Sequence, residues 1–170
     1  KRSVGDMVSV TADIFGDGHE VLAAELRWKP RDGEDWSRAP MRPRGNDRWQ
    51  GSFPLLRVGP HDFSIEAWWD EFGTFRRDFA KKREAGLDLR LEITEGRMLL
   101  DRFAAEAEPD ERAVIEAHLD RLGASPDEDS ALLLSGTLAG AMAKADPRLH
   151  ATGAERVFAV LDAPAEVDTG

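Results

Sequence analysis

The sequence predicts an α+β fold: an immunoglobulin-like antiparallel β-sandwich opened by an inserted bundle of about three helices. Apolar residues alternate with polar ones over roughly the first 80 positions, which is typical of half-buried strands. After that they recur every three or four residues, which is typical of helices. All five Trp lie in the first 79 residues, as do six of the eight Phe. We therefore expect a sandwich over residues 1–82, a helical insert over 83–150 and a return strand over 151–170.

The strands are predicted by four alternating runs separated by residues that favour turns. A hairpin tip at Glu71-Phe72-Gly73 is then expected to lead into a last strand over 74–79. Short antiparallel strands joined by turns in this way are typical of a sandwich. The four runs are Val4 to Ile14, Leu22 to Trp28, Trp49 to Leu55 and Phe63 to Trp69.

The helical part begins with two helices. The first is expected from near Asp88 to Pro109, because apolar residues from Ile93 to Ala107 fall at offsets of three and four. The second carries Pro109 in its first turn and ends before Gly123, which suits the preference for proline at a helix start and glycine just past its end.

The third helix has the clearest start. Ser125-Pro126-Asp127-Glu128 supplies an N-cap serine, a proline at the first helical position and a glutamate that can complete a capping box. Its apolar stripe runs from Leu134 to Ala145, and Pro147 ends it. Residues 156–161 then return to strand character.

Charge excludes several classes of partner. The 170 residues contain 23 Lys and Arg against 33 Asp and Glu, a formal net charge of −10, which repels nucleic acid and anionic lipid alike. No apolar run approaches 18 residues, and the first residues lack the apolar stretch of a signal peptide. Cysteine is absent, which excludes disulfides and thiolate chemistry. We expect a cytoplasmic protein with neither nucleic-acid nor membrane partners.

The common catalytic templates do not fit. Gly16-Asp17-Gly18 is followed by Val21 where a dinucleotide fingerprint needs glycine. His19-Glu20 is followed by Ala23 where a zinc-binding helix needs a second histidine. Ser135 lacks the flanking glycines of a nucleophile elbow. Carboxylates are abundant, but no pair stands out. We therefore expect no catalytic, metal-binding or cofactor-binding residue, and no cofactor.

The tryptophans have the greatest binding potential, because an indole face stacks on a sugar ring as it does on other flat apolar surfaces. Trp28, Trp49 and Trp69 lie on the alternating apolar faces, so we expect them in the core. Trp36 lies in a polar stretch, and Trp68 is out of phase with the apolar positions of its strand. Trp36 and Trp68 are therefore the candidate sugar contacts, although for Trp68 we favour cover by protein over contact with sugar.

Several sequence phrases also resemble a known family. Together they resemble the amino-terminal region of the bacterial α-1,4-glucan:maltose-1-phosphate maltosyltransferases, members of the α-amylase (glycoside hydrolase 13) superfamily. The phrase from Ala12 to Glu20 is the most distinctive of them. The phrases are Val4-Gly5-Asp6, Thr11 to Ala24, Pro40-Met41, Asn46 to Phe53, Glu66 to Asp70, Phe75 to Asp78, Lys81-Lys82 and Glu84-Ala85-Gly86.

The resemblance implies a fold and an activity for the parent enzyme. Family members begin with an immunoglobulin-like domain, interrupt it with a helical insert and continue into an amylase-type (β/α)8 barrel. The parent transfers maltosyl units from α-maltose 1-phosphate to α-1,4-glucans with retention of configuration. Its catalytic carboxylates lie in the barrel, which this chain does not contain, so no catalytic residue carries over.

For the chain itself, the resemblance implies a structural and dimerisation role as the front part of a retaining glycosyltransferase. The expected partners are its own barrel and a second copy, with Leu134, Leu138 and Met142 at the dimer interface. The alternative is a carbohydrate-binding module that holds α-glucan on Trp36 and Trp68. An independent small enzyme ranks last, because the residues show no catalytic pattern.

Overall fold

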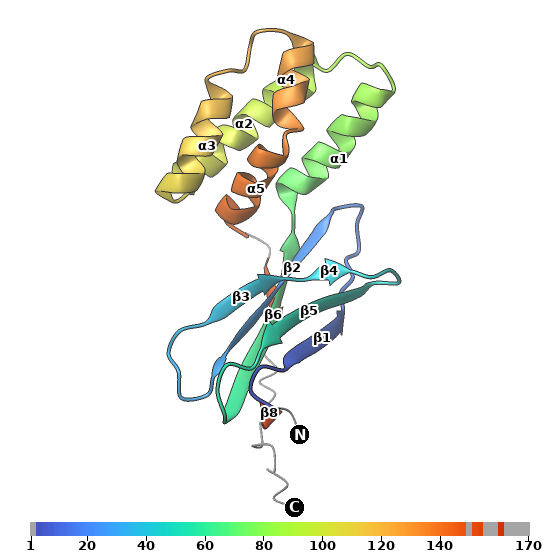
Figure 1. The fold of residues 1–170 in the computed structure, drawn as a ribbon. Coiled ribbons are helices and arrows are strands. Elements are labelled where there is room, and N and C mark those ends of the chain that lie inside the picture. Colours follow the sequence, from blue (N-terminus) through green and yellow to red (C-terminus); the bar gives the residue numbers. More distant parts are fainter. Residues whose placement is uncertain (1–2, 149–150, 155–159, 162–170) are drawn as a thin grey trace, which may run out of the picture. The chain divides into compact units, whose positions relative to one another are not determined.

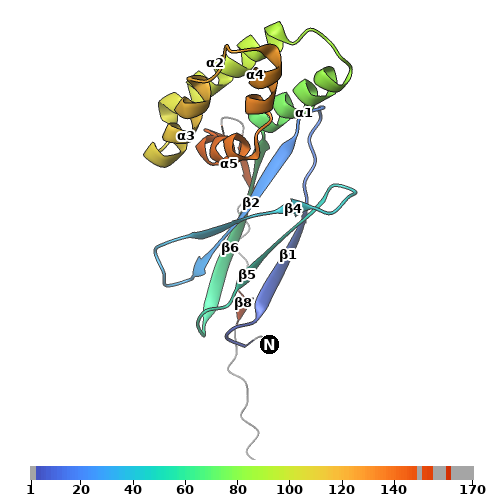
Figure 2. The same cartoon turned by 45° about the horizontal axis from the view of Figure 1, so that its top comes forward.

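The computed structural model describes residues 3–148, 151–154 and 160–161. It confirms the α+β class: antiparallel sheets and helices form two compact units, residues 1–69 with 150–170, and residues 70–149 (Figures 1 and 2). The strands are β1 (Met7–Asp13), β2 (Leu22–Pro30), β3 (Ser37–Pro40), β4 (Arg42–Pro43), β5 (Arg48–Pro54), β6 (Pro60–Trp69), β7 (Thr152–Ala154) and β8 (Val160–Leu161). The helices are α1 (Glu71–Glu84), α2 (Arg90–Glu106), α3 (Pro109–Leu119), α4 (Pro126–Leu133) and α5 (Gly136–Ala145).

The strands form two antiparallel sheets that share one core. One sheet has the order β1-β5-β4, and the other has the order β3-β2-β6-β7 with β8 also paired to β6. The Trp28 ring of β2 stacks on the Phe53 ring of β5 at 5.3 Å between centroids, so the two sheets meet through aromatic side chains. The buried core residues are Val8, Val10, Ala24, Leu26, Met41, Trp49, Phe53 and Leu55.

Alternation accounts for the four long strands. In β1, for example, Val8 and Val10 are buried whereas Ser9 and Thr11 are exposed, as a strand with one face on the core requires. In β5 a glycine allows the sheets to approach. A Cβ on Gly51 would lie 3.1 Å from the Met41 Cγ atom and be similarly crowded by Leu26. The predicted strands at these positions are confirmed.

Two short strands have no counterpart in the sequence prediction. β3 and β4 flank the buried Met41, and each ends in a proline. Strands of four and two residues are too short for alternation to show. At the other end of the chain, β7 and β8 both fall within the return strand expected over 151–170, and its residues 155–159 and 162–170 lie outside the described part.

The helical unit has a separate core. Its helices each turn one apolar stripe inward, which is the expected behaviour of amphipathic helices in a bundle. The predicted first helix is confirmed as α2, and the predicted second helix as α3, with Pro109 at its start. The buried residues are Phe72, Phe79, Leu89, Leu99, Leu100, Phe103, Ala104, Ala107, Ile115, Leu122, Leu132, Leu133, Leu138, Ala141 and Met142.

The predicted strand over 74–79 is wrong, because this segment belongs to α1. The Asp70 side chain accepts a hydrogen bond from the Gly73 backbone N–H at 2.7 Å, which caps the helix and leaves no hairpin tip at Glu71-Phe72-Gly73. Residues 70–82, which the sequence assigned to the sandwich, therefore lie in the helical unit.

The predicted third helix is divided in two. α4 ends at Leu133, and α5 starts at Gly136 with Ser135 as its N-cap. The Ser135 Oγ atom accepts from the Leu138 backbone N–H at 3.1 Å, so the serine starts a new helix instead of continuing the old one. The described residues thus contain five helices where about three were expected.

The close packing of α2 gives a test. A Cβ on Gly96 would lie 2.8 Å from the Phe75 ring and 3.1 Å from the buried Leu133 side chain. We expect Gly96→Ala to destabilise the helical unit by about 1–3 kcal/mol in spite of the better helix propensity of alanine. Urea denaturation followed by circular dichroism measures the change.

The matched control is Gly140→Ala in α5, where a Cβ would meet nothing within 4 Å. This variant should gain about 0.5–1 kcal/mol from helix propensity alone. Equal effects of the two substitutions would contradict the packing described for Gly96.

Candidate functional site

The two candidate sugar contacts lie far apart. Trp36 is 39% exposed, and the Lys29 ammonium lies 5.2 Å from its ring centroid. Its neighbour Ser37 pairs with Trp28 on β2, whereas Trp68 pairs with Ala23, five residues earlier on the same strand. At about 3.3 Å per residue this separates the two positions by about 17 Å, so they cannot stack on one sugar ring.

The structure overturns the expectation for one of the two adjacent tryptophans, Trp69. Trp68 is only 7% exposed, which agrees with the favoured interpretation of cover by protein. Trp69 is 43% exposed, so its predicted place in the core is wrong. It ends β6 beside the β1–β2 loop, where a Cβ on Gly16 would lie 3.6 Å from the Trp69 Nε1 atom. Together with the exposed Phe15 of that loop, Trp69 gives this end of the sheets aromatic surface.

Ion pairs occupy the polar face of β2 and β6. Arg27 pairs with Glu25 on its own strand at 3.1 Å and with Glu66 across the sheet. Arg31 pairs with Asp62 at 2.9 Å. These carboxylates are thus held by arginines within the sheet, and this face offers charged groups where a sugar platform needs flat apolar surface.

A groove of about 700 Å³ runs between α1 and α2. Two ion pairs cross it, Arg102 with Glu71 at 2.5 Å and Lys82 with Glu92. The volume lies in the range of ligand and partner pockets, although the groove is open to solvent along its length. Its apolar lining residues are Phe75, Phe79, Met98 and Leu99, and its remaining lining residues are Glu71, Thr74, Asp78, Lys82, Glu92, Glu95 and Arg102.

Electrostatics in the groove centre on Glu92, which is only 9% exposed. The hydrogen bond from the Lys82 ammonium holds the pKa of Glu92 below its ordinary value and raises the pKa of Lys82. The second carboxylate oxygen, Oε2, is buried and has no hydrogen-bond partner among the described residues. The pair therefore ties α1 to α2 and leaves one acceptor unused.

The residues expected at a dimer interface are mostly internal. Leu138 and Met142 are fully buried in the helical core, so their contacts lie within the chain. Leu134 is half-buried at the end of α4, and its carbonyl accepts from Arg76 at 2.7 Å. A periodic apolar stripe identifies the side of a helix that faces the core, and these residues belong to that side.

The exposed apolar residues of the helical unit were missed by sequence reasoning. Met98 and Leu91, both on α2, are 67% and 66% exposed, and Leu87 just before the helix is also exposed. Met98 and Leu91 are seven residues apart, so they share one side of the helix. Their only signal in the sequence is that they lie off the apolar stripe of α2.

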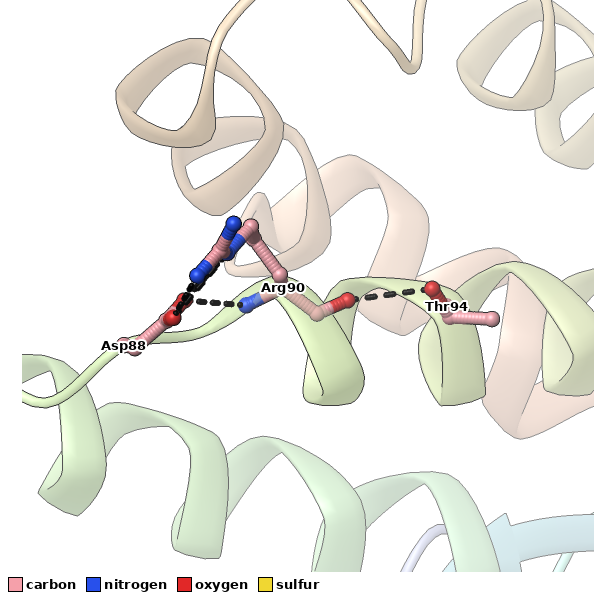
Figure 3. A network of polar contacts seen from close by, with 3 residues as sticks. All are labelled: Asp88, Arg90 and Thr94. Atoms are coloured by element: carbon pink, nitrogen blue, oxygen red, sulfur yellow. Dashed lines mark hydrogen bonds and ion pairs between the residues drawn. The ribbon is translucent and has the colours of Figure 1, made fainter.

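The start of α2 is fixed by Asp88, Arg90 and Thr94 (Figure 3). The Asp88 carboxylate accepts from the Arg90 backbone N–H at 3.1 Å and from the Arg90 Nε atom at 3.0 Å. The Thr94 hydroxyl donates to the Arg90 carbonyl at 3.0 Å. The guanidinium and the backbone donor together lower the pKa of Asp88 to about 2.

The described part of the chain offers neither a cluster of metal ligands nor a membrane-spanning helix. There, no group of three or more His, Asp or Glu side chains is arranged to hold a metal ion. No helix among those residues has the length and apolar character needed to cross a membrane.

Comparison with known proteins gives consistent matches. The model of the family "α-1,4-glucan:maltose-1-phosphate maltosyltransferase, domain N/S" matches residues 1–162. The maltosyltransferase of Myxococcus xanthus is 43% identical over 76% of the chain and 21% of its own length. Those of Burkholderia pseudomallei and Chlorobaculum tepidum are 38% and 33% identical, over 96% and 93% of the chain but only 14% and 24% of their own lengths. The chain thus spans about a fifth of the relatives that it matches.

The Asp88–Arg90 pair gives a testable titration. We expect the Asp88 carboxyl to titrate near pH 2 and, in Arg90→Ala, to move up toward its ordinary value of 3.8. Because the folded pKa is the lower one, its contribution to stability is present above about pH 4 and is lost as the pH falls toward 2. Carboxyl chemical shifts followed by NMR measure both midpoints.

Thr94→Ala is the control, because it removes a hydrogen bond at the same helix start without touching the carboxylate. Its Asp88 midpoint should equal that of the unaltered chain. A midpoint near 3.8 in the unaltered chain would show that the arginine contact is absent in solution.

Proposed function

The chain belongs to the α-1,4-glucan:maltose-1-phosphate maltosyltransferase N/S-domain family, and from this premise we propose that it is the non-catalytic amino-terminal part of such an enzyme. The parent would extend α-1,4-glucans from α-maltose 1-phosphate in the cytoplasm. The match over nearly the whole chain is the observation that carries this proposal.

The path of the chain supports a more specific description of the fold. The chain leaves the β6 edge at Trp69, forms five helices and re-enters the sheet at β7, which pairs with β6 from Ile65 to Ala67. We propose that the two sheets are an immunoglobulin-like sandwich and that the helices are its insert. The shared core of the sheets and the separate core of the helices support this interpretation.

The non-catalytic role is supported by where the carboxylates are. A retaining glycosyl transfer needs two of them about 5–5.5 Å apart on either side of the reacting bond. The more buried carboxylates of the described residues already serve the fold: Glu66 pairs with Arg27, Glu92 pairs with Lys82, and Asp129 accepts from the Gly123 backbone N–H. The reaction itself would belong to a barrel outside this chain.

A second copy of the chain is the proposed partner of the helical unit. Leu87, Leu91 and Met98 are exposed apolar side chains close together in sequence, and Met98 also lines the α1–α2 groove. Burying one such side chain against a partner contributes about 1.5–3 kcal/mol. The interface residues of the proposed dimer are therefore these three, in place of Leu138 and Met142.

Glucan binding is the alternative function, and of the two predicted sugar contacts only Trp36 is exposed. One indole stacked on one sugar ring contributes about 0.5–1.5 kcal/mol, which falls far short of a millimolar affinity. Several aromatic subsites would be needed, and Trp68 cannot supply one from its buried position.

Sedimentation equilibrium tests the dimer. We expect the chain to dimerise, and Met98→Glu to weaken the dimer by about tenfold or more, since the lost burial corresponds to at least 1.5 kcal/mol. Leu56→Glu is the control, because Leu56 is equally exposed but lies between the strands β5 and β6. A chain that stays monomeric at the highest attainable concentration would contradict the proposal.

Calorimetry with maltoheptaose separates the two functions. The structural role predicts no heat of binding at millimolar ligand. Heat that disappears in Trp36→Ala and persists in Trp69→Ala would favour a binding module at Trp36. Heat lost only in Trp69→Ala would place a glucan contact at the β1–β2 loop end of the sheets.

A further inference from the structure

A serine and a histidine meet in a pocket that the proposed function does not use. The His118 Nε2 atom on α3 lies 3.0 Å from the Ser135 Oγ atom at the start of α5. Both side chains are half-buried and line a pocket of about 580 Å³ in the helical unit. This is the distance between a nucleophile and its general base in acyl-transfer sites.

The tautomer of the neutral imidazole follows from its second contact. The His118 Nδ1 atom lies 2.8 Å from the Val114 backbone carbonyl, which can only accept. Nδ1 therefore carries the hydrogen, and in the neutral ring Nε2 is an acceptor. The Ser135 hydroxyl donates to it. The carbonyl thus holds the imidazole in the tautomer that a general base requires, as the third member of a catalytic triad does.

The surroundings of the serine favour negative charge on its oxygen. The Leu138 backbone N–H donates to the Oγ atom at 3.1 Å, and Ser135 is the N-cap of the ten-residue helix α5. The N–H groups of Gly136 and Thr137, in the first turn, have no acceptor within their own helix. They are available for the oxyanion that develops when an ester carbonyl is attacked.

We propose that this pocket is a reactive-serine site for a short-chain acyl ester, with Ser135 as nucleophile and His118 as general base. The lining sets the class of substrate. Ala131 and Leu132 offer a small apolar surface that suits a short acyl chain. Arg121 and Glu128 carry opposite charges, so the lining has no net charge and suits an uncharged ester.

The reaction has two balanced steps. In the first, the Oγ–H proton moves to His118 Nε2, the Ser135 oxygen bonds to the acyl carbon, and the alcohol leaves with that proton. In the second, His118 takes a proton from water, the hydroxide attacks the acyl carbon, and the carboxylic acid departs as the serine regains its proton. Water is the only co-reactant, and no oxidant or metal is required.

The test uses the whole 170-residue chain with p-nitrophenyl acetate as the probe. We expect release of p-nitrophenolate above the buffer rate and an acetyl group on Ser135, located by peptide mass spectrometry. His118→Gln should lower the rate by about 100-fold, since glutamine can keep a hydrogen bond to Ser135 but cannot take up the proton. Ser135→Asn should abolish acetylation while keeping a residue that caps helices well.

Ser125→Ala is the matched control. Ser125 is also the N-cap of a helix, α4, and accepts from the Glu128 backbone N–H, but it does not line the pocket. Its rate should equal that of the unaltered chain, and circular dichroism should show all variants folded. Acetyl found on Ser125 or on lysine instead of Ser135, or a rate unchanged in His118→Gln, would overturn the proposal. Since no carbohydrate takes part, the result bears neither on the place of the chain in a maltosyltransferase nor on the proposed dimer; acyl transfer at Ser135 would be an activity beside the glycosyl transfer of the parent.

Discussion

The structure depends most on the hydrogen bond between the Gly73 backbone N–H and the Asp70 side chain. β6 ends at Trp69 and α1 begins at Glu71, so a single residue turns the chain from strand to helix. Without the cap, the first N–H groups of α1 would have no acceptor, and the helix would start with unsatisfied donors. With it, Phe72 and Phe79 fall on one side of a helix and enter a core separate from that of the sheets. The division into two units follows from this local choice.

Most of the fold could be predicted, because alternation and helical periodicity depend on each segment alone. The apolar pattern correctly predicts β1, β2, β5, β6, α2 and α3. The prediction is wrong where two local signals compete. Gly73 is typical of a turn and predicts a hairpin tip followed by a strand. In the structure its backbone N–H donates to the Asp70 side chain, which caps α1 instead. Ser135 lies inside an apolar stripe and starts a helix of its own, so one predicted helix became α4 and α5. In both cases one side chain, that of Asp70 or of Ser135, caps a helix at a position where the pattern of apolar residues predicts something else.

The candidate site was harder to predict, because sequence spacing says which face a residue occupies but not where that face ends. Trp69 shares the inner face with Ile65 and Ala67, yet it lies at the strand's last position and is exposed. Leu138 and Met142 show the opposite error, since an apolar stripe marks the core before it marks an interface. His118 and Ser135 are 17 residues apart on different helices, so no spacing rule could join them.

One ion pair in the α1–α2 groove, between Lys82 and Glu92, is partly removed from solvent. Lys82 donates to one oxygen of Glu92, whereas the other, Oε2, is itself buried and has no donor among the described residues, which is costly even beside an open groove. A partner that covered Met98 and Phe75 would exclude more water and strengthen the existing ion pair. The interface proposed for a second copy therefore combines the apolar surface around Met98 with the Lys82–Glu92 ion pair that lines the same groove.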